Sequence, residues 1–266
     1  MRMILCPLFS GSGGNATLVC LGDTRLLVDA GVSASRILKA LSLLGVAPES
    51  ISGILVTHEH IDHIKGLPVF VKKTGVPVYA NAGTWQGILA KDGRIPHEMR
   101  RVITTGEDFI IGGVNTHPFA IPHDAADPVG YVFSRNGGKL GVATDLGYLS
   151  DSWLAQLHGC QALVLESNHD VDMLRKGSYP EQLKRRILSR KGHLCNEDSA
   201  RALVTLALGG TQAAFLAHLS GENNQPELAL SCAERALVDA GILADGRFFL
   251  GMAKTDGPSE VISLVL

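Results

Sequence analysis

The sequence predicts an α/β protein in which two mixed sheets pack face to face and helices cover the outer faces. Alternating strand and helix patterns occupy the first and last thirds of the 266-residue chain, and a β-rich stretch with glycine and proline separates them. Two packed sheets with outer helices satisfy this order. Because the chain shows neither a long linker nor a repeat, we expect residues 1–266 to form a single domain.

The first third begins with short apolar strands separated by turns. Gly22–Asp23 is typical of a turn between two of them. The segment SASRILKALSLL (33–44) has apolar residues at helical spacing, a serine at the N-cap position and Gly45 at its end. We expect strands at 3–8, 17–21, 25–29, 51–57 and 76–79, and helices at 33–44 and 64–73.

The centre and the last third continue this pattern. The central stretch is rich in β-branched and aromatic residues, and the last third alternates between apolar strands and amphipathic helices. We expect strands at 109–111, 114–120, 130–134, 140–144, 162–166, 213–217 and 248–250, and helices at 179–189, 196–206 and 225–239.

Composition limits the class of protein. Hydrophobic residues at 45% and charged residues at 19% are typical of a soluble globular protein, and a net charge of −2 excludes a global basic field for nucleic acid or anionic membranes. The apolar residues 1–9 indicate a first strand and not a signal peptide, and no apolar stretch is long enough to cross a membrane. Five scattered cysteines without a C-x-x-C motif favour free thiols in a reducing compartment. We therefore expect a cytoplasmic protein without a membrane partner.

The segment THEHIDH (57–63) follows the apolar strand 51–57 and carries three histidines and two acids. His58 and His60 lie two apart in extended chain, so both rings can point the same way. Asp62 and His63 follow as the chain turns into a helix, and they form a second pair with a different direction. These donors cannot all bind one tetrahedral ion and leave a position open for chemistry. They suit two adjacent divalent ions better than an incidental polar loop.

Several further stretches extend the pattern. They are FSGSGGNATLV (9–19), RLLVDAG (25–31), VTHEHIDH (56–63), IPHDAADPVGY (121–131), GVATDLG (141–147), LVLESNHD (163–170), GHLCNED (192–198) and LAHLSGENNQPELAL (216–230). Together they resemble the metallo-β-lactamase fold superfamily and, within it, the YycJ/WalJ branch on the ribonuclease Z and phosphodiesterase side. The resemblance implies a four-layer αββα sandwich over nearly the whole chain.

The resemblance also implies a ligand set. His58, His60 and His123 would hold one ion, Asp62, His63 and His218 would hold the second, and Asp145 would bridge the two. Asp29 either orients the metal loop by accepting hydrogen bonds or caps a turn. Two divalent cations are expected as cofactors, and mixed histidine and carboxylate ligands suit zinc, manganese or iron.

The implied chemistry is hydrolysis by a hydroxide that bridges the two ions. In ribonuclease Z a glutamate and a histidine in comparable places form a proton-donating pair. We therefore predict Asp62, His193 and Glu166 as catalytic residues, with His193 as general acid and Glu166 raising its basicity. A purely structural Glu166–His193 pair is the alternative.

The substrate is the least determined property. The resemblance implies a nuclease that acts on DNA from the 5′ end, and such an enzyme needs a positively charged strip. Six basic residues would support this if they cluster beside the metals, namely Arg100, Arg101, Lys184, Arg185, Arg186 and Lys191. The alternatives are hydrolysis of a small ester, thioester or cyclic phosphodiester, and a non-catalytic regulatory role. Transfer-RNA processing is disfavoured because the chain shows neither a β-CASP-sized insertion nor the long arm of ribonuclease Z.

Four other residues near these motifs need an interpretation. His169 either contacts a phosphate or is a turn residue at the end of a strand. Ser12 and Asn15, in and after the glycine-rich segment GSGG, are candidates for substrate contacts. Cys195, close to His193, is interpreted as a bystander thiol because a complete metal set makes a cysteine nucleophile unnecessary.

Overall fold

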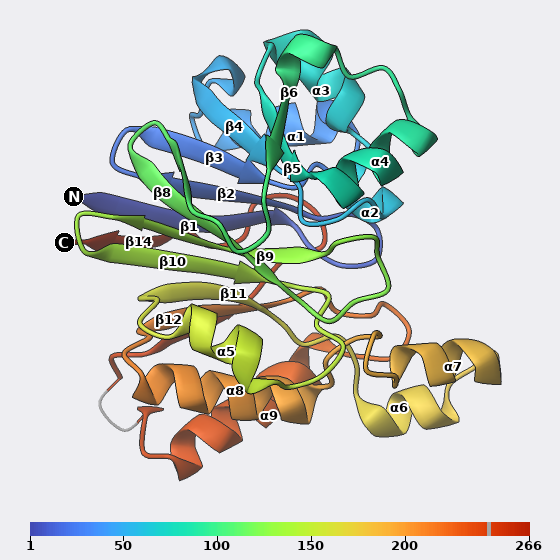
Figure 1. The fold of residues 1–266 in the computed structure, drawn as a ribbon. Coiled ribbons are helices and arrows are strands. Elements are labelled where there is room, and N and C mark those ends of the chain that lie inside the picture. Colours follow the sequence, from blue (N-terminus) through green and yellow to red (C-terminus); the bar gives the residue numbers. More distant parts are fainter. Residues whose placement is uncertain (244–245) are drawn as a thin grey trace.

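The protein, described here from a computed structural model of residues 1–243 and 246–266, consists of two sheets between layers of helices (Figure 1). The first sheet has seven strands in the order β14-β1-β2-β3-β4-β5-β6. Strands β3 to β6 are parallel, and β14, β1, β2 and β3 pair antiparallel. Its strands are β1 (Arg2–Phe9), β2 (Ala16–Leu21), β3 (Thr24–Val28), β4 (Ile51–Leu55), β5 (Val78–Asn81), β6 (Arg100–Ile103) and β14 (Ile262–Val265).

The second sheet also has seven strands, in the order β13-β12-β11-β10-β9-β8-β7. Strands β10 to β13 are parallel, whereas β7 to β10 form an antiparallel meander. Its strands are β7 (Phe109–Ile111), β8 (Val114–Ala120), β9 (Val129–Arg135), β10 (Gly138–Ala143), β11 (Ala162–Glu166), β12 (Ala213–Ala217) and β13 (Phe249–Met252). Both sheets are mixed, which confirms the predicted αββα class.

Helices cover the outer face of each sheet. The first sheet is covered by α1 (Ala34–Leu43), α3 (Leu67–Thr74) and α4 (Ala82–Lys91), and the second by α5 (Asp151–Leu157), α8 (Asn196–Leu208) and α9 (Pro226–Asp239). The shorter helices α2 (Ile61–Ile64), α6 (Val171–Lys176) and α7 (Glu181–Ile187) lie at one end of the sandwich. No helix among the described residues is long and apolar enough to cross a membrane.

The apolar layer between the sheets also fixes the start of the metal loop. Leu26, Val28 and Leu55 of the first sheet pack in one cluster with Tyr131 and Phe133 of the second. The hydroxyl of the fully buried Tyr131 donates a 2.8 Å hydrogen bond to the Val56 carbonyl. Each burial of a large apolar side chain contributes about 1.5–3 kcal/mol, so the end of β4 is held by the core itself.

The structure changes one predicted helix. The segment 64–73 is not continuous but divides into α2 and α3 at Gly66. A Cβ at Gly66 would lie 2.0 Å from the Val32 carbonyl oxygen, and the Gly66 N–H donates to the Ala30 carbonyl at 2.8 Å. The chain therefore bends here to pack closely against the segment that follows β3.

Local patterns missed some elements and misjudged some caps. Ser33 occupies the N-cap of α1, but its side chain makes no capping hydrogen bond. Cys195 is the N-cap of α8, which begins at the predicted residue, and its side chain also makes no capping hydrogen bond. Strands β6 and β14 and helices α4, α5 and α6 were not predicted. The two strands are short and lie at the edges of the first sheet, α5 and α6 are short, and two glycines interrupt the apolar pattern of α4.

Candidate metal centre

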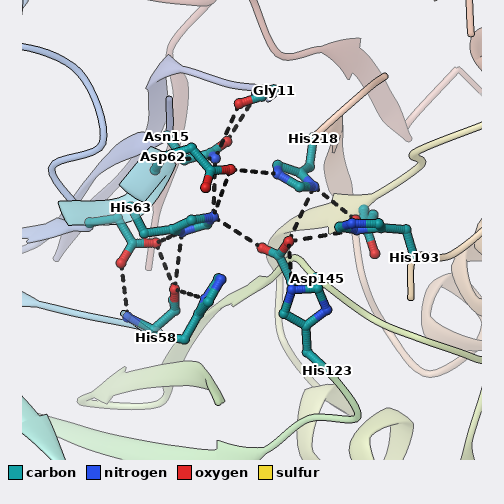
Figure 2. A network of polar contacts seen from close by, with 12 residues as sticks. Gly11, Asn15, His58, Asp62, His63, His123, Asp145, His193 and His218 are labelled. Carbon is teal, nitrogen blue, oxygen red and sulfur yellow. Dashed lines mark hydrogen bonds and ion pairs between the residues drawn. The ribbon is translucent and has the colours of Figure 1, made fainter. Parts of the chain in front are cut away.

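The site forms where the carboxyl ends of strands from both sheets meet. Three of its residues follow β3, β10 and β12 with left-handed backbone conformations: Asp29 (φ 62°), Asp145 (φ 61°) and His218 (φ 57°). Such conformations are uncommon for residues other than glycine, and they cluster at functional sites. The side chains of Asp145 and His218 are directed toward the segment 57–63 (Figure 2), and Asp29 contacts Thr57 and His63 of that segment.

The first group of donors is a set of imidazoles. One ring nitrogen each from His58, His60 and His123 lies within 4.8 Å of the others. Burial, followed by repulsion from the neighbouring rings, lowers the pKa of His58 well below its ordinary value, so its ring is neutral and offers a lone pair. The Nδ1 of His123 donates to the Gly192 carbonyl at 3.0 Å, which leaves Nε2 directed at the centre.

The second group combines Asp62, His63 and His218, again with ligand atoms within 4.8 Å. The Nδ1 of His63 donates to Asp29 Oδ2 at 2.8 Å. Asp29 also accepts from the Thr57 N–H at 2.8 Å and the Thr57 hydroxyl at 2.9 Å. Asp29 therefore orients the metal loop, residues 57–63, through both His63 and Thr57. A role for Thr57 was not predicted from the sequence. The Nε2 of His63 is left facing Asp62 at 3.5 Å.

Asp145 lies between the two groups and contacts both (Figure 2). Its Oδ2 is 3.3 Å from His63 Nε2, and its Oδ1 is 3.6 Å from His123 Nε2. Residues far apart in the sequence thus meet around one buried carboxylate, as the ligand set predicted from the resemblance requires.

Unsatisfied atoms show that this cluster suits cations. His58 Nε2, His218 Nε2 and Asp145 Oδ2 are buried and have no hydrogen-bond partner. Buried polar atoms are normally satisfied, and imidazole nitrogens with carboxylate oxygens are the donors that divalent transition metals prefer. The residues present therefore fit two adjacent metal ions.

The buried side chain of Glu166 accepts four hydrogen bonds beside the cluster. Its Oε1 accepts from His193 Nδ1 and from His218 Nδ1, each at 2.9 Å. Its Oε2 accepts from the backbone N–H groups of Leu146 at 2.6 Å and Leu194 at 3.1 Å. Burial would raise the pKa of this carboxyl, but the two histidines hold it well below its usual value.

The sequence predicted the pairing of Glu166 with His193 and a metal-ligand role for His218, but not the contact between Glu166 and His218. The pairing of the strands explains the contact between Glu166 and His218. Glu166 ends β11 opposite Ala217 of the parallel neighbour β12, and His218 is the next residue. Two other residues fix the His218 backbone. Ser10 Oγ accepts from its N–H at 2.7 Å, and the Asn168 amide donates to its carbonyl at 2.8 Å.

The protonation of the cluster without metal follows from its carboxylates. Burial opposes a charge on His218, but the nearby carboxylates of Asp145, Asp62 and Glu166 outweigh it and raise the pKa to about 10. For His63, burial is likewise outweighed, mainly by Asp29 and Asp145, and its pKa lies well above the ordinary value. Protons on these two rings thus balance the buried carboxylates.

The glycine-rich loop 11–14 supports the metal loop. Asn15 is buried, accepts from the Gly11 N–H at 2.9 Å, and donates its own N–H to the Asp62 carbonyl at 2.8 Å. These contacts assign Asn15 a bracing role, whereas Ser12 is exposed at the loop tip. Burial raises the pKa of the Cys195 thiol to about 12, which agrees with its interpretation as a bystander.

The six basic residues do not form one group. Arg186 pairs with Asp124, the residue after His123, and so reaches the rim of the centre. Lys184 pairs with Glu181 and donates to the Arg175 carbonyl. The side chains of Arg100 and Arg101 donate to the backbone carbonyls of Ile95, Glu98 and Arg100, and the Arg100 guanidinium also lies over the Trp85 ring, away from the metal cluster.

A sandwich of two mixed sheets with a histidine and aspartate cluster at the strand ends defines a metal-dependent hydrolase of the metallo-β-lactamase fold. The model of the β-lactamase superfamily domain matches residues 24–219, and the chain belongs to this family. It is 44% identical to the exodeoxyribonuclease YycJ of Bacillus anthracis over 241 residues, 91% of each protein. It is 39% identical to the exodeoxyribonuclease WalJ of Streptococcus pneumoniae over 224 residues, which cover 84% of this chain and 83% of that one.

Solved structures agree on the fold. The metallo-β-lactamase fold protein YhfI of Bacillus subtilis superposes with a TM-score of 0.72 at 16% identity over 99% of both chains. The short form of human tRNase Z gives a TM-score of 0.65 at 16% identity over 99% of this chain and 100% of that one. At these identities the likeness concerns the architecture alone, and it confirms the predicted fold family.

Proposed function

We propose that this protein is a dinuclear metal-dependent phosphodiesterase that degrades DNA from the 5′ end. The observation that carries the proposal is the pair of ligand groups that share Asp145, with the Glu166–His193 pair directly beside them. Substantial identity over most of the chain to two proteins named exodeoxyribonucleases supports DNA as the substrate. Free cysteines, together with this substrate, favour the cytoplasm as its location.

The residues divide into two ligand sets. His58, His60 and His123 would hold one ion, Asp62, His63 and His218 the other, and Asp145 would contact both. When bound, such ions lower the pKa of a water molecule and polarise phosphate oxygens. Zinc, manganese and iron all accept these ligands, and their availability in the cell decides between them.

His193 is the proton donor of the proposed reaction. Its Nδ1 donates to Glu166, so the ring orientation is fixed and Nε2 faces the other way. Hydrolysis adds the hydroxyl of water to phosphorus, breaks the bond from phosphorus to the 3′-oxygen, and releases the other proton of the water to solvent, from which His193 is reprotonated for the next cycle. The proton from His193 goes to that oxygen, and the Glu166 carboxylate stabilises the charged ring before transfer.

Basic residues on α7 and the loop after it provide a path for the DNA backbone. Arg185, Arg186 and Lys191 are exposed, and Arg186 reaches Asp124 at the edge of the centre. Neutralising a few phosphates in this way gives salt-dependent binding without any sequence preference. The strip is local, which agrees with the small net charge of −2 of the whole chain.

The proposal is tested with purified protein and added manganese or zinc. The substrates are 5′-phosphorylated duplex DNA, single strands and bis-p-nitrophenyl phosphate. We expect release of mononucleotides from the 5′ end, and loss of about 10³-fold in rate for Asp145→Ala, since a metal ion supplies several kcal/mol of transition-state stabilisation. Asp172→Ala, which removes an exposed carboxylate on α6, is the matched control.

Three outcomes would contradict the proposal or part of it. Cleavage of bis-p-nitrophenyl phosphate without degradation of any DNA would favour the alternative function, hydrolysis of small esters or cyclic phosphodiesters. No hydrolysis of any substrate by protein that binds two ions favours the non-catalytic role. Full activity of Asp145→Ala removes Asp145 from the centre.

A further inference from the structure

A small cavity adjoins His193. It has a volume of about 180 Å³ and is lined by Tyr148, His169, Arg190, His193, Cys195 and Asp198, together with apolar residues of the flanking segments. A liquid water molecule occupies about 30 Å³, so the cavity has room for about six waters or one small polar group with part of a sugar. None of the proposed metal ligands lines it.

His169 is the unexplained residue of this cavity. Its ring is 1% exposed, and neither ring nitrogen has a hydrogen-bond partner. Its backbone is fixed on both sides, because the Asn168 N–H donates to the Leu194 carbonyl at 2.9 Å and the Asn196 N–H donates to the His169 carbonyl at 3.0 Å. An unsatisfied buried imidazole is costly unless a ligand completes it. Burial lowers its pKa to about 4, so the ring is neutral near pH 7 and retains one N–H donor.

The lining of the cavity holds one cation, Arg190, and one acid, Asp198, and further acids lie close by at Glu166, Asp170 and Glu197. The guanidinium of Arg190 lies 3.9 Å from the centre of the Tyr148 ring, and no ion pair is recorded for it among the described residues. The thirteen-residue helix α8 begins at the cavity wall, with its N-terminal end and N-cap Cys195 there. The acid that lines the cavity, Asp198, is paired with Arg201 on the same helix.

The position of the cavity relates it to the leaving group. His193 lines both the metal cluster, through its contact with Glu166, and the cavity. If His193 delivers its proton to the leaving oxygen, the leaving fragment lies on the cavity side of the scissile bond. A volume of about 180 Å³ excludes a long strand, so the fragment that leaves must be short.

We propose that this cavity is the subsite for the terminal 5′-phosphate of the nucleotide that is released. The inference rests on the proposed exonuclease function and adds the group that the enzyme recognises. A terminal phosphate carries close to two negative charges, which Arg190, the α8 terminus and the N–H of His169 would bind. Cleavage of the bond to the 3′-oxygen leaves a new 5′-phosphate on the remaining strand, so each cycle regenerates the recognised group.

The test compares two duplexes of identical sequence, one with a 5′-phosphate and one with a 5′-hydroxyl. We expect wild-type kcat/KM to be at least about 10-fold higher for the phosphorylated end, the effect of one lost charge-assisted contact. Arg190→Ala, on an exposed residue, and His169→Leu remove this preference and leave the rate on the 5′-hydroxyl duplex within about twofold. Arg190→Lys keeps part of it. Arg185→Ala lowers both rates equally, and the distant Arg235→Ala changes neither.

A binding measurement separates this inference from the proposed function. Metal-free protein is titrated calorimetrically with a deoxynucleoside 5′-monophosphate and with the deoxynucleoside itself. We expect the monophosphate to bind at least about 10-fold more tightly, and Arg190→Ala to abolish the difference. Equal binding of the two compounds, or equal degradation of the two duplexes by the wild type, overturns the subsite. Absence of DNA degradation with phosphate-selective binding overturns the proposed function and not the subsite.

Discussion

Asp29→Asn tests how the metal loop is oriented. The substitution keeps the shape of the side chain, and asparagine tolerates the left-handed backbone of this position, with φ 62°. Asp29 uses Oδ1 for the Thr57 N–H and Oδ2 for both the Thr57 hydroxyl and His63 Nδ1. Asparagine has only one acceptor oxygen, so its NH2 group has to take the place of either Oδ1 or Oδ2.

Either orientation of the amide has a cost. If nitrogen replaces Oδ2, it faces the N–H of His63, and the ring has to move its proton to Nε2, the atom proposed to bind metal. If nitrogen replaces Oδ1, two donors face each other at Thr57, which costs about 1–3 kcal/mol. Loss of such an outer contact typically lowers metal affinity about 10- to 100-fold, or about 1.4–2.7 kcal/mol.

The assay is calorimetric titration of metal-free protein with zinc or manganese. We expect the weaker affinity at the site of His63, with the other site less affected. Asp23→Asn, in the exposed turn between β2 and β3, is the matched control and should bind like the wild type. An affinity of Asp29→Asn within twofold of the wild type would refute the proposed orienting role.

Three further predictions follow from the same contacts. Without metal, the pKa of His63 lies well above its ordinary value and that of His218 is about 10, so both rings carry protons at pH 7 that binding must displace. Metal affinity should therefore rise with pH, with about two protons released on binding. Calorimetric titrations in buffers of different ionisation enthalpy measure this release, and the same binding enthalpy in every buffer would contradict it. Glu166→Gln should lower kcat by about 10²-fold and alter the alkaline limb of the pH–rate profile, and an unchanged profile would reduce Glu166 to a structural role. Gly87→Ala should lower both stability and activity, because a Cβ there would lie 2.3 Å from Glu59 Cγ in the metal loop. Unchanged thermal unfolding would contradict this close packing.

Local patterns were sufficient for the central strands and the metal loop. The strands β7, β8, β11 and β12 have the predicted bounds. Strands β7, β11 and β12 are largely apolar runs, whereas β8 alternates between buried and less buried residues over its first half, and turn residues flank these strands. The motif around His58 is informative because its donors are adjacent in sequence, and the strand ends near His123, Asp145 and His218 indicated that these residues share one edge.

Other features depend on contacts that no local pattern encodes. Strand β14 forms by pairing Ile262 with Leu5 at the opposite end of the chain. Tertiary packing also determines the three contacts of Asp29 with Thr57 and His63 and the contact of Glu166 with both His193 and His218. The left-handed backbone conformations at the strand ends depend on the same packing. The cavity beside His169 was not foreseen, because segments far apart in the sequence form its walls.

The most direct test of the account is a crystal structure of the protein with manganese, with anomalous scattering used to locate the ions. We expect two peaks, one among His58, His60 and His123 and one among Asp62, His63 and His218, with Asp145 within ligand distance of both. A single peak, or a pair in which Asp145 contacts neither ion, would contradict it.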